Sequence, residues 1–299
     1  MNRRSFIGKA SLGFAAVTLI NQRLLSAGIS IDPMRIKMLT DDVGVFTEMG
    51  GTILFYLSQE GIVVVDSEFP EQSKHLIEEL HKKSDKPFQL LINTHHHGDH
   101  SSGNISFKGL VPKVLAHANS LKNQKNVAVA QKTEDKQLYP DTTFTDTWSG
   151  KAGKEKITLR YFGAAHTDGD AMIHLENANV VHMGDLVNNR RYPFIDRTTG
   201  ASIQNWIVVL DKAMKTFDGK TTFVYGHASP GFEVYGKKDD LTAMKNYFEK
   251  LVDFTTKSLK AGTSKEDFLK TTAIPGVSDW VGDGIQRSLT AAYEEFSAK

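Results

Sequence analysis

The amino-acid sequence predicts a mixed α/β (α+β) protein, an αββα sandwich in which two β-sheets pack face to face and helices cover the outer faces. The chain has two β-rich halves, and in each half short apolar runs are followed by a segment with helical spacing. Such layers bury the apolar side of every element. No linker rich in Pro, Gly or Ser divides the chain. We therefore expect one domain over residues 28–299, preceded by an export signal at residues 1–27.

The first half begins with short strands separated by turns. Residues 53–57 and 62–66 are two apolar runs, and the continuous apolar character of the second indicates burial on both faces. A helix is expected at residues 70–83, because Pro occupies its first turn and its apolar residues share one face. This helix leads to an apolar run at 88–93, which makes a β-α-β crossover. Residues 114–117 complete this half as another strand.

The second half repeats this plan. Strands are expected at residues 157–162, 171–175 and 179–183, and a helix at 202–217. The apolar stripe of that helix is typical of a helix that packs on a core, and it consists of Ile203, Trp206, Ile207, Leu210 and Met214. Further helices are expected at about 238–256, 265–271 and 283–296. This C-terminal part either covers the sandwich or contributes to a dimer, so both a monomer and a homodimer remain open.

A run of potential metal ligands directly follows the apolar residues 90–92. It reads Thr94-His95-His96-His97-Gly98-Asp99-His100. Imidazole nitrogens combined with a carboxylate suit a borderline cation such as Zn²⁺. Three adjacent histidines alone would equally fit a His-rich surface loop, so the interpretation depends on the rest of the chain.

Three later strands end in the same way, with a small residue followed by a candidate ligand. They lead to His166, Asp185 and His227. A single His after a strand is more often structural than a ligand. Four strand ends that together offer five His and two Asp instead indicate one site at a shared edge of the sandwich. The candidate ligands are His95, His97, Asp99, His100, His166, Asp185 and His227.

This series resembles the metallo-β-lactamase superfamily over about residues 43–227. The resemblance implies two Zn²⁺ per chain, one held by His95, His97 and His166 and the other by Asp99, His100 and His227, with Asp185 bridging the two. A hydroxide shared by the ions would attack the substrate, and Asp99 would have a further catalytic role in carrying a proton to the leaving group.

The resemblance also implies a hydrolase acting on a small-molecule substrate through an ester, lactone, thioester or amide/lactam bond. The best-known metallo-β-lactamases use Cys where this chain has Asp185, and Asp is the commoner choice in other hydrolases of the superfamily. Three alternatives are a class B-like β-lactamase, a mononuclear iron dioxygenase of the same fold, and a metal-binding protein without turnover. The complete set of seven ligands counts against the dioxygenase.

Several residues near these ligands have expected supporting roles. Asp66 matches an acidic residue that braces the metal loop in the superfamily, or it caps the helix that begins near residue 70. Loops beside the metals are expected to recognise the substrate. Asn189 and Tyr192 follow the bridging Asp closely, and Phe46 begins a hairpin tip over the site. Three further histidines are expected outside the ligand set, with His96 lining the pocket and His117 and His182 packed in the fold.

Residues 1–27 indicate export. They contain the twin-arginine sequence Arg3-Arg4-Ser5-Phe6-Ile7, a short apolar segment and a cleavage site after Ala27, and we expect a periplasmic protein. The alternative is a disordered basic N-terminus. Residues 28–299 keep 32 basic and 35 acidic residues, a net charge of −3, which excludes the basic stripe of a nucleic-acid-binding protein. The absence of Cys excludes disulfides, thiolate ligands and a lipoprotein anchor, and the apolar segment is too short for a stable membrane anchor.

Overall fold

The computed structural model describes residues 34–282 and 284–297. The expected export signal at residues 1–27 therefore lies outside the described residues, as does its boundary with the domain. Residues from Met34 onward group into one compact unit. No helix in the described part of the chain has the length and apolar character needed to cross a membrane.

The first sheet has seven strands in chain order. They are β1 (Arg35–Met38), β2 (Val43–Thr47), β3 (Ile53–Leu57), β4 (Ile62–Val65), β5 (Phe88–Ile92), β6 (Val114–His117) and β7 (Thr142–Phe144). The strands from β1 to β4 are antiparallel, whereas β4, β5, β6 and β7 run parallel. The expected crossover is confirmed, because α2 (Pro70–Lys83) connects β4 to the parallel strand β5. The first sheet also carries α3 (Gly98–Ser101) after β5 and α4 (Ala118–Gln131) after β6.

The second sheet has six strands in the order β15-β13-β11-β10-β9-β8. Their bounds are β8 (Thr147–Ala152), β9 (Glu155–Arg160), β10 (Met172–Leu175), β11 (Val180–His182), β13 (Thr222–Val224) and β15 (Tyr235–Gly236). A separate parallel pair joins β12 (Asn188–Asn189) to β14 (His227–Ala228). The helices that follow are α5 (Ile203–Thr216), α6 (Lys238–Lys260), α7 (Lys265–Leu269) and α8 (Ile285–Ser297). The expected helices in this half are thus present with ends that shift by a few residues.

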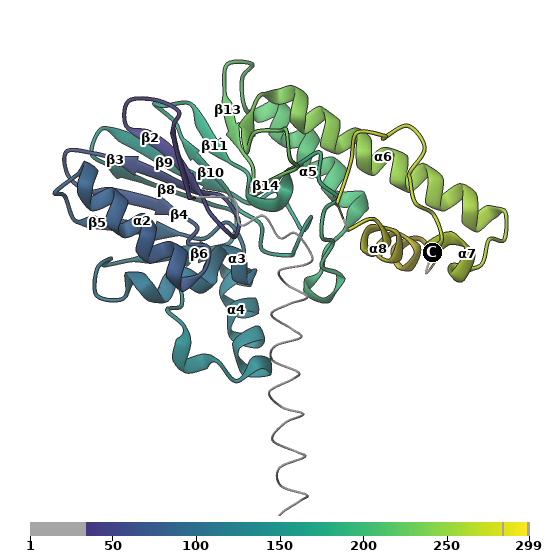
Figure 1. Ribbon diagram of the computed structural model, residues 1–299, viewed down its shortest axis with the longest axis horizontal. Helices are drawn as coiled ribbons and strands as arrows, with labels where there is room; N and C mark the ends of the chain where they lie inside the picture. Colours follow the sequence, from purple (N-terminus) through teal and green to yellow (C-terminus); the bar gives the residue numbers. More distant parts are fainter. Residues whose placement is uncertain (1–33, 283, 298–299) are drawn as a thin grey trace, which may run out of the picture. The chain divides into compact units, whose positions relative to one another are not determined.

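Three clusters of buried side chains define the four layers of the fold. The cluster between the sheets joins alternate residues of the first sheet, such as Val43, Val45 and Val63, to Ile157 and Leu159 of the second. A second cluster packs the opposite face of the first sheet against α2. The third packs the second sheet against α5, α6 and α8. Figure 1 shows α2 on the first sheet and α5 and α6 beside the second. The predicted αββα sandwich is confirmed.

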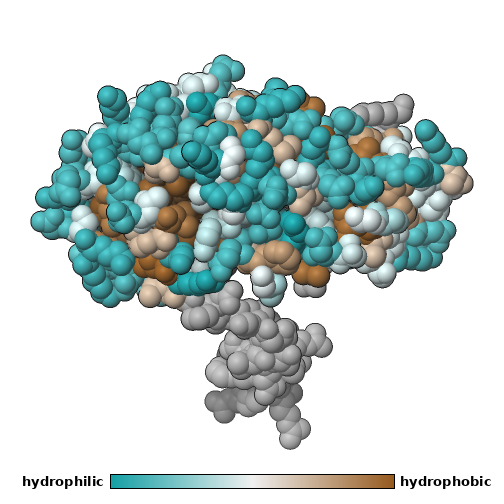
Figure 2. Space-filling model, turned by 90° about the horizontal axis from the view of Figure 1, so that it is seen from above, coloured by the Kyte–Doolittle hydropathy of each residue, from teal (hydrophilic) through white to brown (hydrophobic). Residues whose placement is uncertain are grey.

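The outer surface is mainly polar. Hydrophilic residues cover most of the face seen in Figure 2, and apolar residues gather there in separate patches. The most exposed large apolar side chains include Met49, Val129, Phe194 and Phe232. Scattered apolar residues are normal on a protein surface, so only one that adjoins a chemical site requires an explanation.

Candidate metal centre

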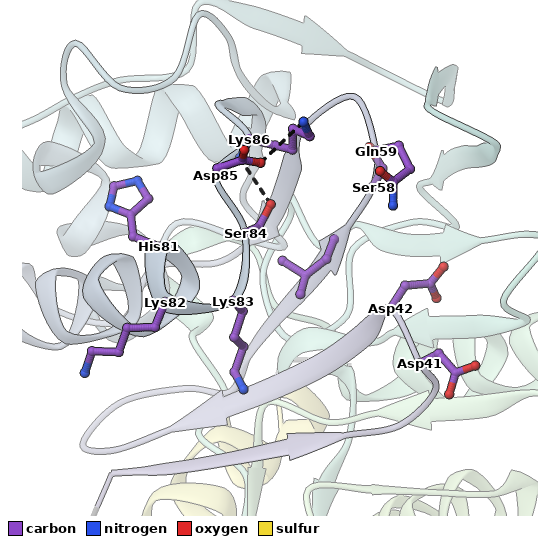
Figure 3. A pocket seen from close by; sticks show the side chains of 11 residues that line it. Asp41, Asp42, Ser58, Gln59, His81, Lys82, Lys83, Ser84, Asp85 and Lys86 are labelled. Atoms are coloured by element: carbon purple, nitrogen blue, oxygen red, sulfur yellow. Dashed lines mark hydrogen bonds and ion pairs between the residues drawn. The ribbon is translucent and has the colours of Figure 1, made fainter.

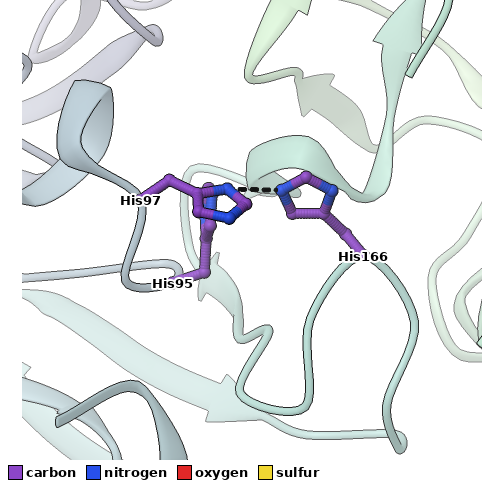
Figure 4. A group of neighbouring side chains, drawn as sticks. All are labelled: His95, His97 and His166. Atoms are coloured by element: carbon purple, nitrogen blue, oxygen red, sulfur yellow. Dashed lines mark hydrogen bonds between the residues drawn. The ribbon is translucent and has the colours of Figure 1, made fainter. Parts of the chain in front are cut away.

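Three histidines converge at the end of β5 and in the loop after β9. The Nε2 atom of His95 lies 3.1 Å from Nδ1 of His97, and Nε2 of His166 lies 2.9 Å from the same Nδ1 (Figure 4). His95 and His97 follow β5, whereas His166 follows β9 of the other sheet. The two sheets therefore each deliver part of the group at one edge of the sandwich, as the sequence predicts.

Hydrogen bonds on the outer side of each ring determine which nitrogen faces the group. Nδ1 of His166 donates to the carbonyl oxygen of Phe194 at 2.7 Å. Nε2 of His97 lies 3.0 Å from Oδ2 of Asp196, which can only accept while it is ionised. Both rings thus carry a proton on the outer nitrogen. In a neutral imidazole the inner nitrogen then presents a lone pair to the group, which is the form that binds a metal.

The third ring, His95, is oriented through a chain of two hydrogen bonds. The hydroxyl of Thr94 donates to Oδ2 of Asp66 at 2.7 Å, so its oxygen is left to accept from Nδ1 of His95 at 3.0 Å. Nε2 of His95 is therefore also a lone pair that faces the group. The lone pair of His97 thus lies 3.1 Å and 2.9 Å from the other two, and lone pairs this close repel one another unless a cation lies among them. A tetrahedral Zn²⁺ with Zn–N bonds of about 2.0–2.1 Å holds its nitrogens roughly 3.3 Å apart, so the group fits this ion.

A second group consists of Asp99, His100 and His227, which the structure brings within 4.8 Å of one another. Nε2 of His227 lies 3.1 Å from Oδ2 of Asp99, and Nε2 of His100 lies 3.7 Å from the same oxygen. Asp99 is the most solvent-exposed member, with 32% of its side chain accessible. This group has one carboxylate and two imidazoles, a donor set that also suits Zn²⁺.

Asp185 lies between the two groups. Its Oδ1 atom is 3.0 Å from Nε2 of His100 and 3.4 Å from Nε2 of His227, while Oδ2 is 3.6 Å from Nε2 of His166. One carboxylate oxygen therefore faces each group. Oδ1 of Asp185 and Nε2 of His100 are both buried, and although they lie 3.0 Å apart, neither makes a hydrogen bond of good geometry. Buried polar atoms are rarely left unpaired, and a bound cation would satisfy both.

Asp66 braces this site, as predicted, and does not cap the following helix. Its carboxylate accepts from the backbone N–H and the hydroxyl of Thr94, and from Nδ1 of His100 at 2.8 Å. One fully buried carboxylate thereby positions a histidine of each group, because Thr94 in turn accepts from His95. The helix α2 begins after Phe69 and has no side-chain cap, so the alternative role for Asp66 is wrong.

Burial and neighbouring charges shift the histidine pKa values of the two groups in different directions. Burial lowers the pKa of His166 to about 3 and holds the pKa of His95 well below its usual value, so these rings are neutral and ready to bind a cation. For His227, burial acts downward but the carboxylates of Asp185 and Asp99 outweigh it and raise the pKa to about 9. In the absence of a metal, a proton on His227 therefore balances the negative charge of the carboxylates in the second group.

Two glycines allow backbone to pass directly beside the candidate ligands. A Cβ atom at Gly51 would collide with the ring of His100, and one at Gly226 would collide with the carboxylate of Asp185. Any side chain at either position would displace the ligand next to it. Gly51 ends the β2–β3 hairpin tip, and its N–H also donates to the backbone oxygen of Asp99 at 2.9 Å.

Comparison with known proteins decides the family. The sequence profile described as the Metallo-beta-lactamase superfamily matches residues 47–227. The chain belongs to the metallo-β-lactamase superfamily. It is 24% identical over 203 residues to the "Metallo-beta-lactamase type 2" of Elizabethkingia meningoseptica, covering 65% of this chain and 78% of that protein. It is also 24% identical over 205 residues to the protein of the same name from Bacillus sp. (strain 170), covering 66% and 77%.

Solved structures show the same fold. A metallo-β-lactamase from Pontibacter korlensis superposes with a TM-score of 0.61 at 17% identity, covering 72% of this chain and 99% of that one. The VMB-1 crystal structure gives a TM-score of 0.59 at 19% identity, covering 72% and 96%. In this metallo-β-lactamase superfamily member, residues 228–297 lie beyond the range that the family profile matches.

The three residues expected to contact the substrate are Phe46, Asn189 and Tyr192, and they differ in how far they are buried. Phe46 is fully buried and packs between the first sheet and α2, so the expectation that its side chain faces a substrate is corrected. Successive residues of a strand point to opposite faces, and Phe46 is on the helix-covered face. Asn189 is buried, and its amide donates to the backbone oxygen of Glu233. Tyr192 is half-buried beside Tyr247, with ring centroids 6.1 Å apart.

His117 and His182 have the structural positions predicted for them, whereas His96, which was expected to line the pocket, is buried. Nε2 of His117 donates to the carbonyl oxygen of Thr145 at 2.8 Å, and its Nδ1 accepts from the backbone N–H of Asn119 at the start of α4 at 3.2 Å. His182 is fully buried and contacts the backbone oxygen of Thr52 at 2.9 Å. His96 is 4% exposed, and its Nε2 lies 3.7 Å from Oδ2 of Asp196.

Sequence reasoning missed Asp196, and it included Phe194 only as the last residue of a loop at 188–194 that could reach the substrate. Both lie in the loop between β12 and α5, where no apolar periodicity marks a position. The only local signal is the order Asp196-Arg197-Thr198-Thr199, in which an Asp carboxylate accepts from the backbone two residues later. That pattern predicts a turn but does not reveal that the same carboxylate contacts His97.

A surface hollow of about 610 Å³ lies away from these ligands. Its lining residues come from the β1–β2 and β3–β4 turns and from the end of α2, as Figure 3 shows. They include Asp42, Lys83 and Lys86. Because Lys86 precedes β5 while His95 follows it, the hollow is at the opposite sheet edge and does not belong to the metal centre.

Proposed function

We propose that this protein is an exported binuclear zinc hydrolase that cleaves an ester, lactone, thioester or amide/lactam bond in a small molecule. The observation that carries the proposal is the pair of adjacent ligand groups with the Asp185 carboxylate facing both. Two bound Zn²⁺ ions would supply a hydroxide at neutral pH and would polarise the bond under attack. The proposed ligands are His95, His97 and His166 for one ion, Asp99, His100 and His227 for the other, and Asp185 for both.

The chain's own residues would contribute orientation and proton transfer. Asp66 and Asp196 hold three of the histidine rings with the metal-binding nitrogen facing inward. Asp99 is the most accessible of the acidic ligands, so it is the group best placed to pass a proton to a leaving group at the solvent side. No Ser or Cys nucleophile is required for this chemistry.

A β-lactamase is the second candidate, because the curated relatives carry that name. Asp185 argues for a different bond, since the best-known metallo-β-lactamases have the softer Cys ligand at this position. A hard carboxylate that faces both ligand groups would hold two ions as a pair, whereas a thiolate would favour one of them. Hydrolysis of lactams and of other acyl compounds must therefore be measured side by side.

Export through the twin-arginine route is part of the same proposal. It is supported by Arg3 and Arg4 followed by the apolar segment and Ala27. That route carries folded proteins, so an enzyme exported by it acquires its metal before it leaves the cytoplasm. The periplasm is the proposed location.

The experiment that tests the function counts metal ions and screens substrates on the same purified protein. Zinc-loaded protein is expected to hold two ions per chain and to hydrolyse at least one member of a panel of lactams, lactones, thioesters and phosphoesters. His97→Ala should lose bound zinc and nearly all turnover. His81→Ala, which removes an exposed ring on α2, is the matched control and should keep both. Full zinc occupancy in His97→Ala, or one ion in the wild type, would refute the binuclear assignment.

A further inference from the structure

One exposed aromatic ring adjoins the three-histidine group. The ring centroid of Phe194 lies 5.4 Å from that of His97 and 6.4 Å from that of His166. The side chain is nevertheless 45% exposed. An apolar ring that faces solvent beside two candidate metal ligands forms a wall at which part of a substrate would be desolvated.

A cation lies over the same ring. The guanidinium carbon of Arg287, an exposed residue on α8, is 5.9 Å from the ring centroid of Phe194. Among residues 34–282 and 284–297, no carboxylate forms an ion pair with Arg287. An uncompensated guanidinium is a strong site for a carboxylate, because its planar donors match the two oxygens.

A second Arg–Phe pair in this protein differs from this one because its arginine is already neutralised by carboxylates. Arg190 lies over Phe232 at 5.5 Å, but it is already ion-paired with Asp279 at 2.7 Å and with Asp240 at 3.5 Å. Its charge is thus used within the fold. Arg287 has the same aromatic contact without these carboxylates.

The two residues are held in place by contacts between the loop and the C-terminal helix. The hydroxyl of Ser288 donates to the carbonyl oxygen of Pro193 at 3.0 Å, next to both Phe194 and Arg287. About two helical turns further on, Glu295 accepts from Arg197 at 3.0 Å and from the N–H of Ile203 at 2.9 Å. The loop and α8 therefore present the ring and the guanidinium as one preorganised surface.

We propose that Phe194 and Arg287 form a recognition site for the substrate, which is an acyl compound with an apolar segment next to the scissile bond and a carboxylate beyond it. The bond is cleaved at the metal centre, the apolar segment lies on Phe194, and the carboxylate pairs with Arg287. This inference rests on the proposed function, because it assumes that the histidine groups hold the reacting bond. It makes the C-terminal helix, which lies beyond the matched family range, part of the substrate site.

The test uses metal-anchored probes that require no turnover. Zinc-loaded protein is titrated by calorimetry with three hydroxamic acids: acetohydroxamate, a phenylacetohydroxamate with a para-carboxylate, and the same compound with a para-carboxamide. All three share the metal-binding group, so differences report the ring and the charge. The variants are Phe194→Ala and Arg287→Gln, and Arg35→Gln serves as the control because Arg35 is an exposed cation on β1. Phe194→Ala keeps the backbone oxygen that accepts from His166.

We expect the wild type to bind the carboxylate probe roughly three- to fivefold more tightly than the carboxamide, near the upper limit for an exposed ion pair. Arg287→Gln should abolish this preference, and Phe194→Ala should weaken both aromatic probes by roughly five- to tenfold. Arg35→Gln should change neither. A preference that survives Arg287→Gln, with acetohydroxamate still bound, would overturn this inference alone. Failure of every protein to bind acetohydroxamate would overturn the proposed function together with it.

Discussion

Replacing Asp196 by Asn tests whether a loop carboxylate sets the orientation of a metal-binding ring. In the native protein, Oδ2 of Asp196 accepts from Nε2 of His97 at 3.0 Å and from the hydroxyl of Thr199 at 2.6 Å. Oδ1 accepts from the N–H of Thr198 at 3.1 Å. Burial raises the pKa of Asp196, but the hydrogen bonds from His97, Thr198 and Thr199 outweigh it and hold the pKa well below its usual value. Every contact of this carboxylate is therefore with a donor.

An Asn side chain cannot reproduce that arrangement. It has one acceptor oxygen, so its amide nitrogen must face either the N–H of Thr198 or Nε2 of His97. If the amide faces His97, that ring gives up its outer proton and places the proton on Nδ1, where the metal should bind. Changes in such outer hydrogen-bond partners cost about 10–100-fold in metal affinity, which corresponds to about 1.4–2.7 kcal/mol. We expect Asp196→Asn to weaken the binding of one zinc ion by this amount and to affect the binding of the other much less.

The measurement is a competition titration of metal-free protein with zinc against a chromophoric chelator, with both binding steps resolved. Asp218→Asn is the matched control, because Asp218 accepts from the N–H groups of Lys220 and Thr221 in an exposed turn away from the histidines. Thermal unfolding of both metal-free variants shows whether the loop remains folded. If Asp196→Asn binds both ions within twofold of the wild type, the orientation argument is refuted.

Three further predictions address the bridge, the pH response and export. Asp185→Asn should lower the rate of hydrolysis by orders of magnitude without unfolding the protein, because it removes the charge that faces both ligand groups. Native-like turnover with two ions bound would contradict the bridging role. In metal-free protein, burial lowers the pKa of His227, but the carboxylates of Asp185 and Asp99 outweigh it and raise the pKa to about 9. The proton on His227 therefore stabilises the fold fully below about pH 6.5, and this stabilisation is lost as the pH rises through 9. Denaturant titrations should show this decline in stability, and a decline that persists in His227→Gln would exclude His227 as its cause. Replacing Arg3 and Arg4 by Lys should retain the precursor in the cytoplasm, and an unchanged periplasmic yield in cell fractionation would end the twin-arginine assignment.

The convergence of the candidate ligands at one edge could be predicted from strand periodicity, whereas their division into two groups came from the family resemblance. An apolar run such as residues 88–92 has to be a buried strand, and the polar residues that come next have to lie at the edge of its sheet. Asp66 was predictable for the same reason, since β4 is parallel to β5 and both end at that edge. The buried strands therefore bring distant segments together before any side-chain contact is considered.

The supporting contacts were not predictable, because they depend on tertiary structure without periodicity. Phe46 could be assigned to a hairpin, but its face depends on strand register, and Val45 instead points into the sandwich. Asp196 and Phe194 acquire their roles only when their loop folds back across His97 and His166. A carboxylate in such a loop has the same local pattern whether it stabilises a turn or also orients a ring.

The two candidate metal groups share the support of Asp66 but differ in their other supports, and this difference has a physical consequence. His100 is fixed by Asp66, which lies at the end of a central strand in the sandwich, whereas His97 and His166 are fixed by a loop that Glu295 of α8 holds. Contacts at the ends of buried strands open only when the sheet opens, while loop contacts can break in local fluctuations. The three-histidine group is therefore the one whose geometry the C-terminal helix can influence, and Phe194 contacts both Arg287 of that helix and His97 of the group. Substrate recognition and metal orientation on this side of the centre consequently share one support.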